Sequence, residues 1–355
     1  MLFYKYKFRS FKITKTQSDM QKRIVNYLSP SSNIALLFYE KNESAIQAVR
    51  KKLFTNLQRY HPSIAIAVRK LLDDRTKNAP SPLIGELYPH ILGGLVSEID
   101  PEIFQEISAQ WLAAYILTIM IDDSFDKGRP IDGALVAPLY LETAKLQKKV
   151  SGKYMAMFEQ LTFEAVRGQI RDTKLQREPK RFKEKLDSAK DKNKILSAFS
   201  VVVAALIQDS KEADFILNFT DNFLLGFQML DDLSDFAIDY NSGNRTFLLS
   251  KISNRTLNNR ALLKHLLNSG MLLKTVDLVL VSLNNGMKML DKKKDAPQSS
   301  SYFDHGDSYL YFFRLTDEVK ELRKLILDYS VAAGMLRKQI LVNINAQLAT
   351  CGQST

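Results

Sequence analysis

The sequence has little of what several common kinds of functional site require. Its single cysteine, Cys351, lies in the C-terminal tail, which excludes an internal disulfide framework. The four histidines, at positions 61, 90, 265 and 305, are scattered without zinc-site spacing. The 14 glycines form no phosphate-binding loop, and no Ser/His/Asp arrangement is visible. A disulfide-rich secreted domain, a structural zinc site, a P-loop enzyme and a triad hydrolase are therefore not expected.

Long hydrophobic runs are also missing. The longest, such as residues 195–207, are interrupted and shorter than the roughly 20 residues that a membrane-spanning helix needs. The N-terminus lacks the apolar core of a signal peptide. These absences, with the lone cysteine, predict a soluble, cytoplasmic protein.

What the sequence does contain is helical periodicity, without strand-like alternation. We expect an all-α fold, a single-domain helical bundle around a central active-site cavity. The expected division is a basic and aromatic segment over 1–35, the helical domain over 36–350 and a tail over 351–355. A helix start is predicted at Asp100-Pro101-Glu102. Helices are expected over 44–76, 103–121, 133–150, 153–177, 180–190, 192–208, 212–238, 256–292 and 308–349, with a mobile loop over 292–306.

The charge balance is basic, with 50 Lys and Arg against 39 Asp and Glu. Most of this charge is interpreted as a solvated surface, and no nucleic-acid partner is expected. Residues 1–23 differ, because seven basic residues against Asp19 alternate with five aromatic ones. This segment is a candidate for peripheral contact with a membrane surface, and equally for a packed or frayed terminus.

The most informative feature is a repeated acidic motif. Asp122-Asp123-Ser124-Phe125-Asp126 and Asp231-Asp232-Leu233-Ser234-Asp235 both read D-D-x-x-D, 109 positions apart, and each ends a long apolar helical pattern. On a helix, residues i and i+4 share a face and i+1 lies beside them. With 25 Asp in 355 residues, roughly 0.1 such matches are expected by chance.

Six carboxylates converging without partners would repel one another and lose hydration. Mg²⁺ takes oxygen ligands and is usually held by one or two carboxylates together with substrate phosphates. Two acidic helix ends that face each other across a cavity therefore predict a magnesium site for a diphosphate. A solvated helix end remains the alternative interpretation for either motif alone.

With both motifs on buried helices, residues 65–255 resemble the trans-isoprenyl diphosphate synthase and class I terpene synthase superfamily. The sharpest likeness is Gly226–Asp235, which is similar to that family's F-Q-x-x-D-D-x-x-D block. Three weaker likenesses follow the family's order: Gly168–Asp172 with G-Q-x-x-D, Lys194–Phe199 with K-T-x-x-x-F, and Gly243–Thr246 with a basic G-K-x-T loop.

The resemblance implies a class I isoprenoid synthase-like fold, a cluster of up to three Mg²⁺ ions, a prenyl diphosphate substrate and a homodimer. It implies that Lys194 and Arg245 steady the leaving diphosphate and that Gln228 points into the cavity. The implied metal ligands, also expected to be catalytic, are Asp122, Asp123, Asp126, Asp231, Asp232 and Asp235. The other substrate-binding candidates are Gln169, Asp172, Tyr115, Phe227 and Arg129.

The chain also departs from the family's pattern. Where chain-elongating synthases hold isopentenyl diphosphate with G-G-K-x-x-R-P, this chain has Asp74–Pro80, without the glycine pair or the arginine before proline. The polar residue seven positions before the first motif is replaced by Tyr115, and only Asp126–Pro130 remains of a later R-R-G-x-P-T block. The second motif is not the N-S-E type of most terpene cyclases. The second-substrate pocket looks eroded and the metal site intact.

These observations favour a magnesium-dependent terpene synthase, a lyase that ionises one prenyl diphosphate and releases diphosphate. The first alternative is a prenyltransferase that adds isopentenyl diphosphate or alkylates another acceptor, which Lys77, Lys127 and Arg129 would support. The second alternative is a non-catalytic partner subunit of a prenyl synthase. Prenyl chain length is not specified by the sequence.

Overall fold

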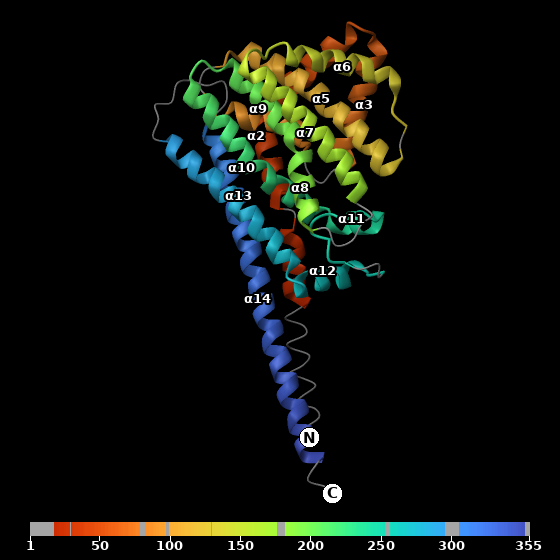
Figure 1. Ribbon diagram of the computed structural model, residues 1–355, viewed down its shortest axis with the longest axis vertical. Coiled ribbons are helices and arrows are strands. Elements are labelled where there is room, and N and C mark those ends of the chain that lie inside the picture. The colour runs from red at the N-terminus through yellow and green to blue at the C-terminus, as the bar shows by residue number, and fades with distance from the viewer. Residues whose placement is uncertain are drawn as a thin grey trace.

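The computed structural model describes residues 18–28, 30–78, 82–96, 99–128, 130–175, 182–252, 256–294 and 305–351. Every regular element in these ranges is a helix, so the predicted all-α fold class is confirmed (Figure 1). A first helical segment covers 18–27. The labelled helices are α2 (Pro30–Gln58), α3 (Pro62–Asn78), α4 (Ile84–Gly93), α5 (Pro101–Lys127), α6 (Gly133–Gln147), α7 (Lys153–Leu175), α8 (Phe182–Lys192), α9 (Lys194–Leu206), α10 (Ser210–Ser234), α11 (Phe236–Ser242), α12 (Asn259–Asn268), α13 (Met271–Lys294) and α14 (His305–Cys351).

The ends of the motif-bearing helix α5 follow from local sequence. The Asp100 side chain accepts hydrogen bonds from the backbone N–H groups of Glu102 and Ile103, at 2.8 and 3.0 Å, and Pro101 occupies the first turn. At the other end Gly128 has a φ of 62° and stops the helix. The predicted helix start at Asp100-Pro101-Glu102 is therefore confirmed.

Three helices differ from expectation. The helix predicted over 212–238 breaks at Asp235, between α10 and α11. The one predicted over 256–292 breaks after α12, where Gly270 adopts a φ of 72°. Helix α4 was not predicted, because its ten residues are almost all buried and contain Pro89. Most of the loop predicted over 292–306 lies outside the described residues.

Helix α10 occupies the middle of the bundle and packs against α9 and α13, while α5 packs against α2 and α6. Large side chains such as Trp111, Phe199, Phe219 and Phe223 fill the main core between these helices. A smaller cluster joins α2, α3, α5 and α6. Ile24 and Leu28, within the predicted N-terminal segment, also pack into the main core.

Helix α14 continues well past the other described helices (Figure 1). Among the described residues, no single helix is both long and apolar enough to cross a membrane. The pair α12 and α13, bent by 70°, meets that test only when the two are counted together.

Candidate active site

Both acidic motifs lie at the C-terminal ends of long helices. Asp122 and Asp123 belong to the last turns of α5, and Asp231 and Asp232 to the last turn of α10. A helix C-terminus carries a partial negative charge, so these carboxylates lie where anions are least favourable. The arrangement therefore calls for positive charge from elsewhere in the fold. The side chain of Asp126 and all of Arg129 lie outside the described residues.

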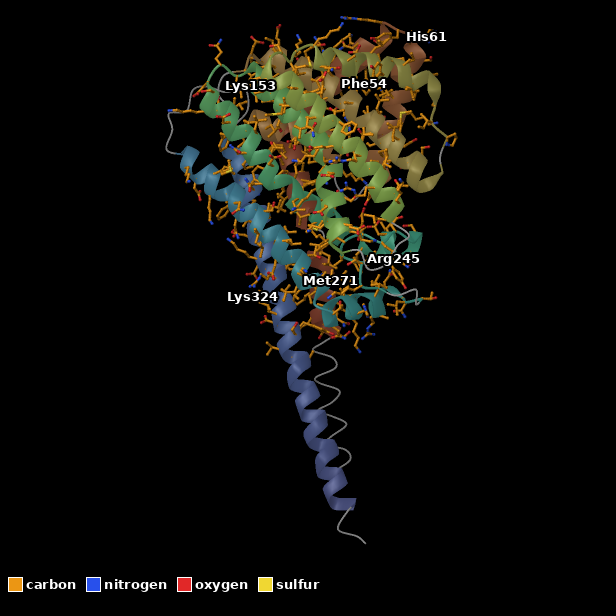
Figure 2. The ribbon with its side chains drawn as sticks, in the orientation of Figure 1. Phe54, His61, Lys153, Arg245, Met271 and Lys324 are labelled. Carbon is orange, nitrogen blue, oxygen red and sulfur yellow. The ribbon has the colours of Figure 1, made fainter. Side chains whose placement is uncertain are left out.

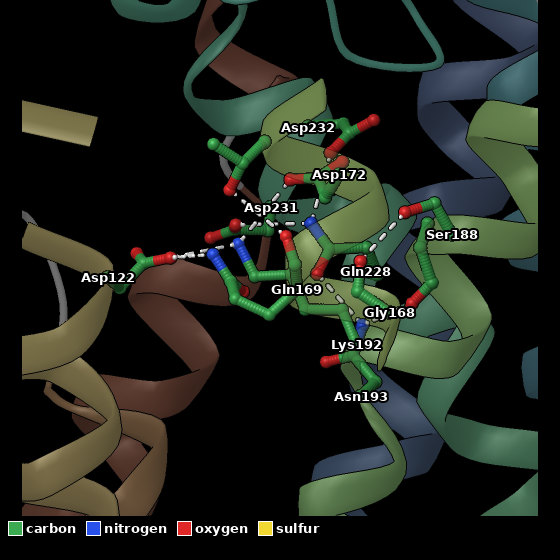
Figure 3. Close-up of polar contacts among 12 residues, drawn as sticks. Asp122, Gly168, Gln169, Asp172, Ser188, Lys192, Asn193, Gln228, Asp231 and Asp232 are labelled. Atoms are coloured by element: carbon green, nitrogen blue, oxygen red, sulfur yellow. Dashed lines mark hydrogen bonds and ion pairs between the residues drawn. The ribbon is translucent and has the colours of Figure 1, made fainter. Parts of the chain in front are cut away.

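Cationic and amide groups from three other helices reach the first motif. Arg75 of α3 forms an ion pair with Asp123. Lys192, the last residue of α8, places its Nζ 3.2 Å from the Asp122 Oδ1 atom and 3.8 Å from Asp172 Oδ2. Gln169 of α7 donates to Asp122 Oδ1 at 2.9 Å. Figure 3 shows the Gln169 and Lys192 side chains reaching Asp122.

The second motif is organised by Gln228, one turn earlier on α10. Its Nε2 donates to Asp232 Oδ1 at 3.1 Å and lies 3.5 Å from Asp231 Oδ2. Its Oε1 accepts from Asn193 Nδ2 at 2.8 Å (Figure 3). Both ends of the amide are used, so the Gln228 side chain is oriented toward the carboxylates by the junction of α8 and α9.

The two motifs are close enough to influence each other's titration. Asp231 remains accessible to solvent, yet the protein around it raises its pKa to about 6, with further increases from Asp235 and Asp122. Lys192 and Gln228 act in the opposite direction. Carboxylates from α5 and α10 therefore share one electrostatic environment.

Two further carboxylates, the buried Asp232 of the second motif and the unpredicted Asp239, also have raised pKa values. Asp232 is buried, and desolvation raises its pKa well above the ordinary value. Asp239 on α11 has its pKa raised to about 7, by burial first and then by Asp231 and Asp235. Asp239 was missed from sequence, although it follows Asp231 and Asp235 at the i+4 spacing that would have indicated it.

The lysine at the site is not the expected one. Lys194 places its Nζ 3.2 Å from Asp221, ten residues before Asp231 on α10 and thus about 15 Å along the helix. The structure therefore does not bring Lys194 to the acidic residues, and Lys192 lies there instead. The cause is the junction between α8 and α9 at Asn193, which turns the two lysines in different directions.

Gly168 allows α7 and α8 to approach closely. A Cβ atom at this position would lie 2.6 Å from the Asp191 carbonyl carbon and would also clash with the Lys192 backbone nitrogen. Ser188 Oγ donates to the Gly168 carbonyl at 3.1 Å (Figure 3). This contact holds Gln169 and Lys192 side by side beneath Asp122.

The basic segment Gly243–Thr246 follows α11 and contains two buried polar atoms with unmet hydrogen-bonding capacity. In the described part of the chain, Arg245 Nη1 and Thr246 Oγ1 have no hydrogen-bond partner. The Arg245 guanidinium lies 5.2 Å from the centre of the Tyr240 ring. The backbone carbonyl of Arg245 accepts a hydrogen bond from the Lys185 side chain of α8. Buried polar groups are nearly always satisfied, so these two are suited to an anionic ligand.

The aromatic candidates fall into two groups. Trp111, Phe199 and Phe223 are almost fully buried, and the Trp111 and Phe199 ring centres lie 5.0 Å apart. Tyr115 and Phe227 are only half buried. The pKa of Tyr115 is raised by burial and then by Asp231, and a Cβ atom on Gly85 would clash with its ring.

Within the described residues, no group of three or more His, Cys, Asp or Glu side chains is close enough to hold a metal ion. Arg75, Lys192 and the two glutamines engage the carboxylates instead. Because Mg²⁺ typically takes only one or two carboxylates, completing its shell with water and phosphate, this oxygen donor set still fits a magnesium–diphosphate ligand.

No protein-family model and no curated protein matches the chain. Among solved structures, the chain is similar to the apo form of an Arabidopsis medium/long-chain length prenyl pyrophosphate synthase. The two share 14% sequence identity with a TM-score of 0.46, over 74% of this chain and 98% of that one. At this level of similarity, the function has to be argued from the residues of the site.

Proposed function

We propose that this chain is a magnesium-dependent enzyme that ionises an allylic prenyl diphosphate and releases diphosphate. The supporting observation is the electrostatic link between Asp122 of α5 and Asp231 of α10, with Lys192 between them. Such a concentration of carboxylates at two helix C-termini is unfavourable unless cations are supplied.

Asp122, Asp123, Asp231 and Asp235, with Asp126, would hold Mg²⁺. When bound, this ion would supply Lewis-acid neutralisation of the charge on the departing diphosphate. Asp232 is buried against Gln228, so its role is to position that amide. The protonatable carboxylates Asp231 and Asp239 would ionise fully when the cation binds.

The chain's own cations stabilise the leaving group. The allylic carbon–oxygen bond breaks, and its electron pair leaves with the diphosphate oxygen. Lys192 exchanges its contact with Asp122 for the diphosphate, and Arg245 directs its unsatisfied Nη1 toward the same anion. Fixed positive charge at this point favours the transition state over the ground state.

The allylic carbocation left behind needs a dry, aromatic environment. Tyr115, whose pKa is influenced by Asp231, and Phe227, which precedes Gln228 on α10, are half-buried rings that would stabilise the cation through their faces. Loss of a proton, with or without prior ring closure, gives a hydrocarbon. We favour this terpene synthase outcome because the segment Asp74–Pro80 lacks the pattern of a second-substrate site.

One contact favours a prenyltransferase as the second candidate. Arg75 belongs to that same segment and reaches the first acidic motif, where it pairs with Asp123. A cation in this position could hold a second diphosphate beside the first, and the product would then be a longer prenyl diphosphate. A non-catalytic partner subunit is the weakest candidate, because it would have no use for the clustered carboxylates.

Product analysis by mass spectrometry tests the proposal. The purified chain is incubated with Mg²⁺ and prenyl diphosphates of increasing length, each with and without isopentenyl diphosphate. An apolar product from a single diphosphate supports the terpene synthase, and a longer diphosphate formed only with isopentenyl diphosphate supports the transferase. No product in any combination contradicts both.

Two matched variants tie the activity to the proposed site. Lys192→Gln is expected to lower turnover about 100-fold, the usual cost of removing one group that stabilises transition-state charge. Lys194→Gln removes the same charge two residues away, beside Asp221, and is expected to leave turnover unchanged. Equal losses in the two variants would contradict the assignment of Lys192.

A further inference from the structure

The net positive charge of the chain comes from three segments that lack acidic residues. Residues 1–18, 240–276 and 329–355 contain no Asp or Glu and hold 13 of the 50 basic residues. The rest of the chain has 37 basic and 39 acidic residues. The net charge of +11 therefore arises entirely from these three acid-free segments, and the remainder is close to neutral.

Described residues from these segments or from their borders meet at one place on the molecule. Gln21 Nε2, in the first helical segment, donates to the Tyr329 hydroxyl at 3.2 Å. A surface hollow of about 390 Å³ is lined by residues from all three segments or their borders: Ser18, Gln21, Asn258, Arg260, Ala261, Lys264 and Tyr329. The first helical segment therefore lies beside α12, where α14 leaves the body of the molecule (Figure 1).

Helix α12 presents a basic face at this end. Its apolar residues Leu262, Leu263, Leu266 and Leu267 are buried in the core. Arg260, Lys264 and His265 are exposed, and Arg260 and Lys264, one turn apart, both line the hollow. Within the described part of the chain, neither of these two cations forms an ion pair.

The first helical segment adds to the same charge. Lys22 and Arg23 are exposed one turn after Ser18, with Asp19 as the only acid of the segment. On the α14 side, Asp328 borders the hollow residue Tyr329. Two acids therefore border this surface, against four exposed cations on the first helical segment and α12.

Helix α14 extends this end of the molecule. Its 47 residues correspond to about 70 Å, and about 33 Å of that follows its last core residue, Tyr329. The sequence of this part has apolar residues at four-residue spacing, Leu336, Ile340, Ile344 and Leu348, with Arg337 and Lys338 and no acid. Most of the stability of protein helices comes from packing of an apolar face, so this pattern favours a surface for the distal part of α14 to pack against.

We infer that this end of the molecule, formed by the first helical segment, α12 and the distal part of α14, docks on an anionic membrane surface. The combination of basic residues with apolar and aromatic ones is what an anionic lipid interface attracts. The 17 residues before the first helical segment strengthen the argument, because they contain five basic and five aromatic residues in alternation. A nucleic acid would use the basic residues and would have no use for the apolar ones.

The inference does not depend on the proposed chemistry and is tested by vesicle flotation of the full chain. Vesicles of phosphatidylcholine alone are compared with vesicles that also contain phosphatidylserine, at low and at high salt. The chain is expected to float with the anionic vesicles and not with the neutral ones. The bound fraction is expected to fall as salt is raised.

The variant Arg260→Gln/Lys264→Gln is expected to weaken vesicle binding about fivefold for each removed charge. Both side chains are exposed, so the fold is expected to persist, and circular dichroism confirms it. Lys149→Gln/Lys153→Gln is the matched control, because both lysines are exposed and Figure 2 shows Lys153 at the opposite end of the molecule. Binding of this control is expected to equal that of the unmodified chain.

Several outcomes would overturn the inference. They are equal binding to neutral vesicles, no binding to either kind, and equal losses in the two double variants. If the chain binds a DNA duplex and does not bind vesicles, the basic face is assigned to nucleic acid instead. A dimer that leaves vesicles unbound would assign α14 to self-association.

Discussion

At the scale of single residues, the molecule concentrates carboxylates where they are least stable. Asp122 and Asp231 stand at helix C-termini, and each is near other acids. Arg75 and Lys192 offset part of this cost but leave the pKa of Asp231 raised. Clustered carboxylates that remain only partly neutralised lower the stability of the fold. A bound cation would offset that cost, so the cluster favours a cation ligand.

Asp231→Asn separates stability from binding. Removing this charge relieves repulsion with Asp235 and Asp122, so the melting temperature without ligand is expected to rise by about one or two degrees. The stabilisation by Mg²⁺ and diphosphate is expected to disappear in the same variant. Differential scanning fluorimetry measures both quantities.

Asp221→Asn is the matched control for this variant. It lies on the same helix, is exposed and pairs with Lys194 away from the acidic residues. It is expected to keep the full ligand-induced shift. A shift that survives in Asp231→Asn would contradict the assignment of this residue as a ligand.

The pH dependence of stability follows from the raised pKa values. Asp231 and Asp239 titrate near 6 and 7 in the folded protein, above the ordinary 3.8, so the folded state holds extra protons between about pH 4 and pH 7. Their contribution therefore lowers the free energy of unfolding as pH rises through this window. Because Mg²⁺ binds the ionised forms, its stabilising effect is expected to grow over the same range.

Thermal melts across the window, with and without Mg²⁺, measure this effect. The double variant Asp231→Asn/Asp239→Asn is expected to flatten the slope in the absence of the metal. An unchanged slope in this variant would mean that other groups are responsible for the pH dependence.

At the scale of elements, the sequence predicted some of the residues that lie together at the candidate site and missed others. Asp122, Asp231, Gln169 and Gln228 were predicted together and do lie together, because helical spacing and the motif order carry that information. Lys192 was missed in favour of Lys194, because the direction of a side chain at a helix junction depends on how α8 and α9 pack.

Other site residues depend on contacts between elements far apart in sequence. Arg75 reaches Asp123 because α3 and α5 contribute to the same smaller core cluster, together with α2 and α6. Asp239 lies near the site on α11, which begins directly after the break of α10 at Asp235, and its pKa is raised by burial and then by Asp231 and Asp235. No local pattern in the sequence encodes the contact of Arg75 with Asp123, whereas the i+4 spacing of Asp239 from Asp235 is a local signal.

Gly168→Ala tests the approach of α7 to α8. The new Cβ would collide with the backbone of Asp191 and Lys192, which cannot move aside as a flexible side chain could. The expected cost is about 1–3 kcal/mol of unfolding free energy. Diphosphate affinity is expected to fall as well, because Lys192 would be displaced from Asp122.

Urea denaturation gives the stability and calorimetry the affinity. Gly133→Ala is the control, because a Cβ atom there meets nothing within 4 Å. This control is expected to change neither quantity appreciably. Wild-type affinity in Gly168→Ala would show that the contact between α7 and α8 does not position Lys192.

At the scale of the whole molecule, hydrophobic periodicity was enough to predict an all-α bundle and most of its helices. It did not predict that the 256–292 pattern divides into α12 and α13, since apolar periodicity continues across Gly270. It also could not show that the first helical segment and α14 converge. That convergence arises from packing of Gln21 against Tyr329, 308 positions apart.

The proposed function requires a diphosphate site between α5 and α10. Titration calorimetry with inorganic diphosphate measures the affinity of this site directly. The unmodified chain is expected to bind diphosphate in the presence of Mg²⁺ and not when the metal is chelated. Lys192→Gln is expected to bind more weakly, and Lys194→Gln as well as the unmodified chain. Absence of binding at saturating Mg²⁺ and diphosphate, or binding that is indifferent to the metal, would contradict the account.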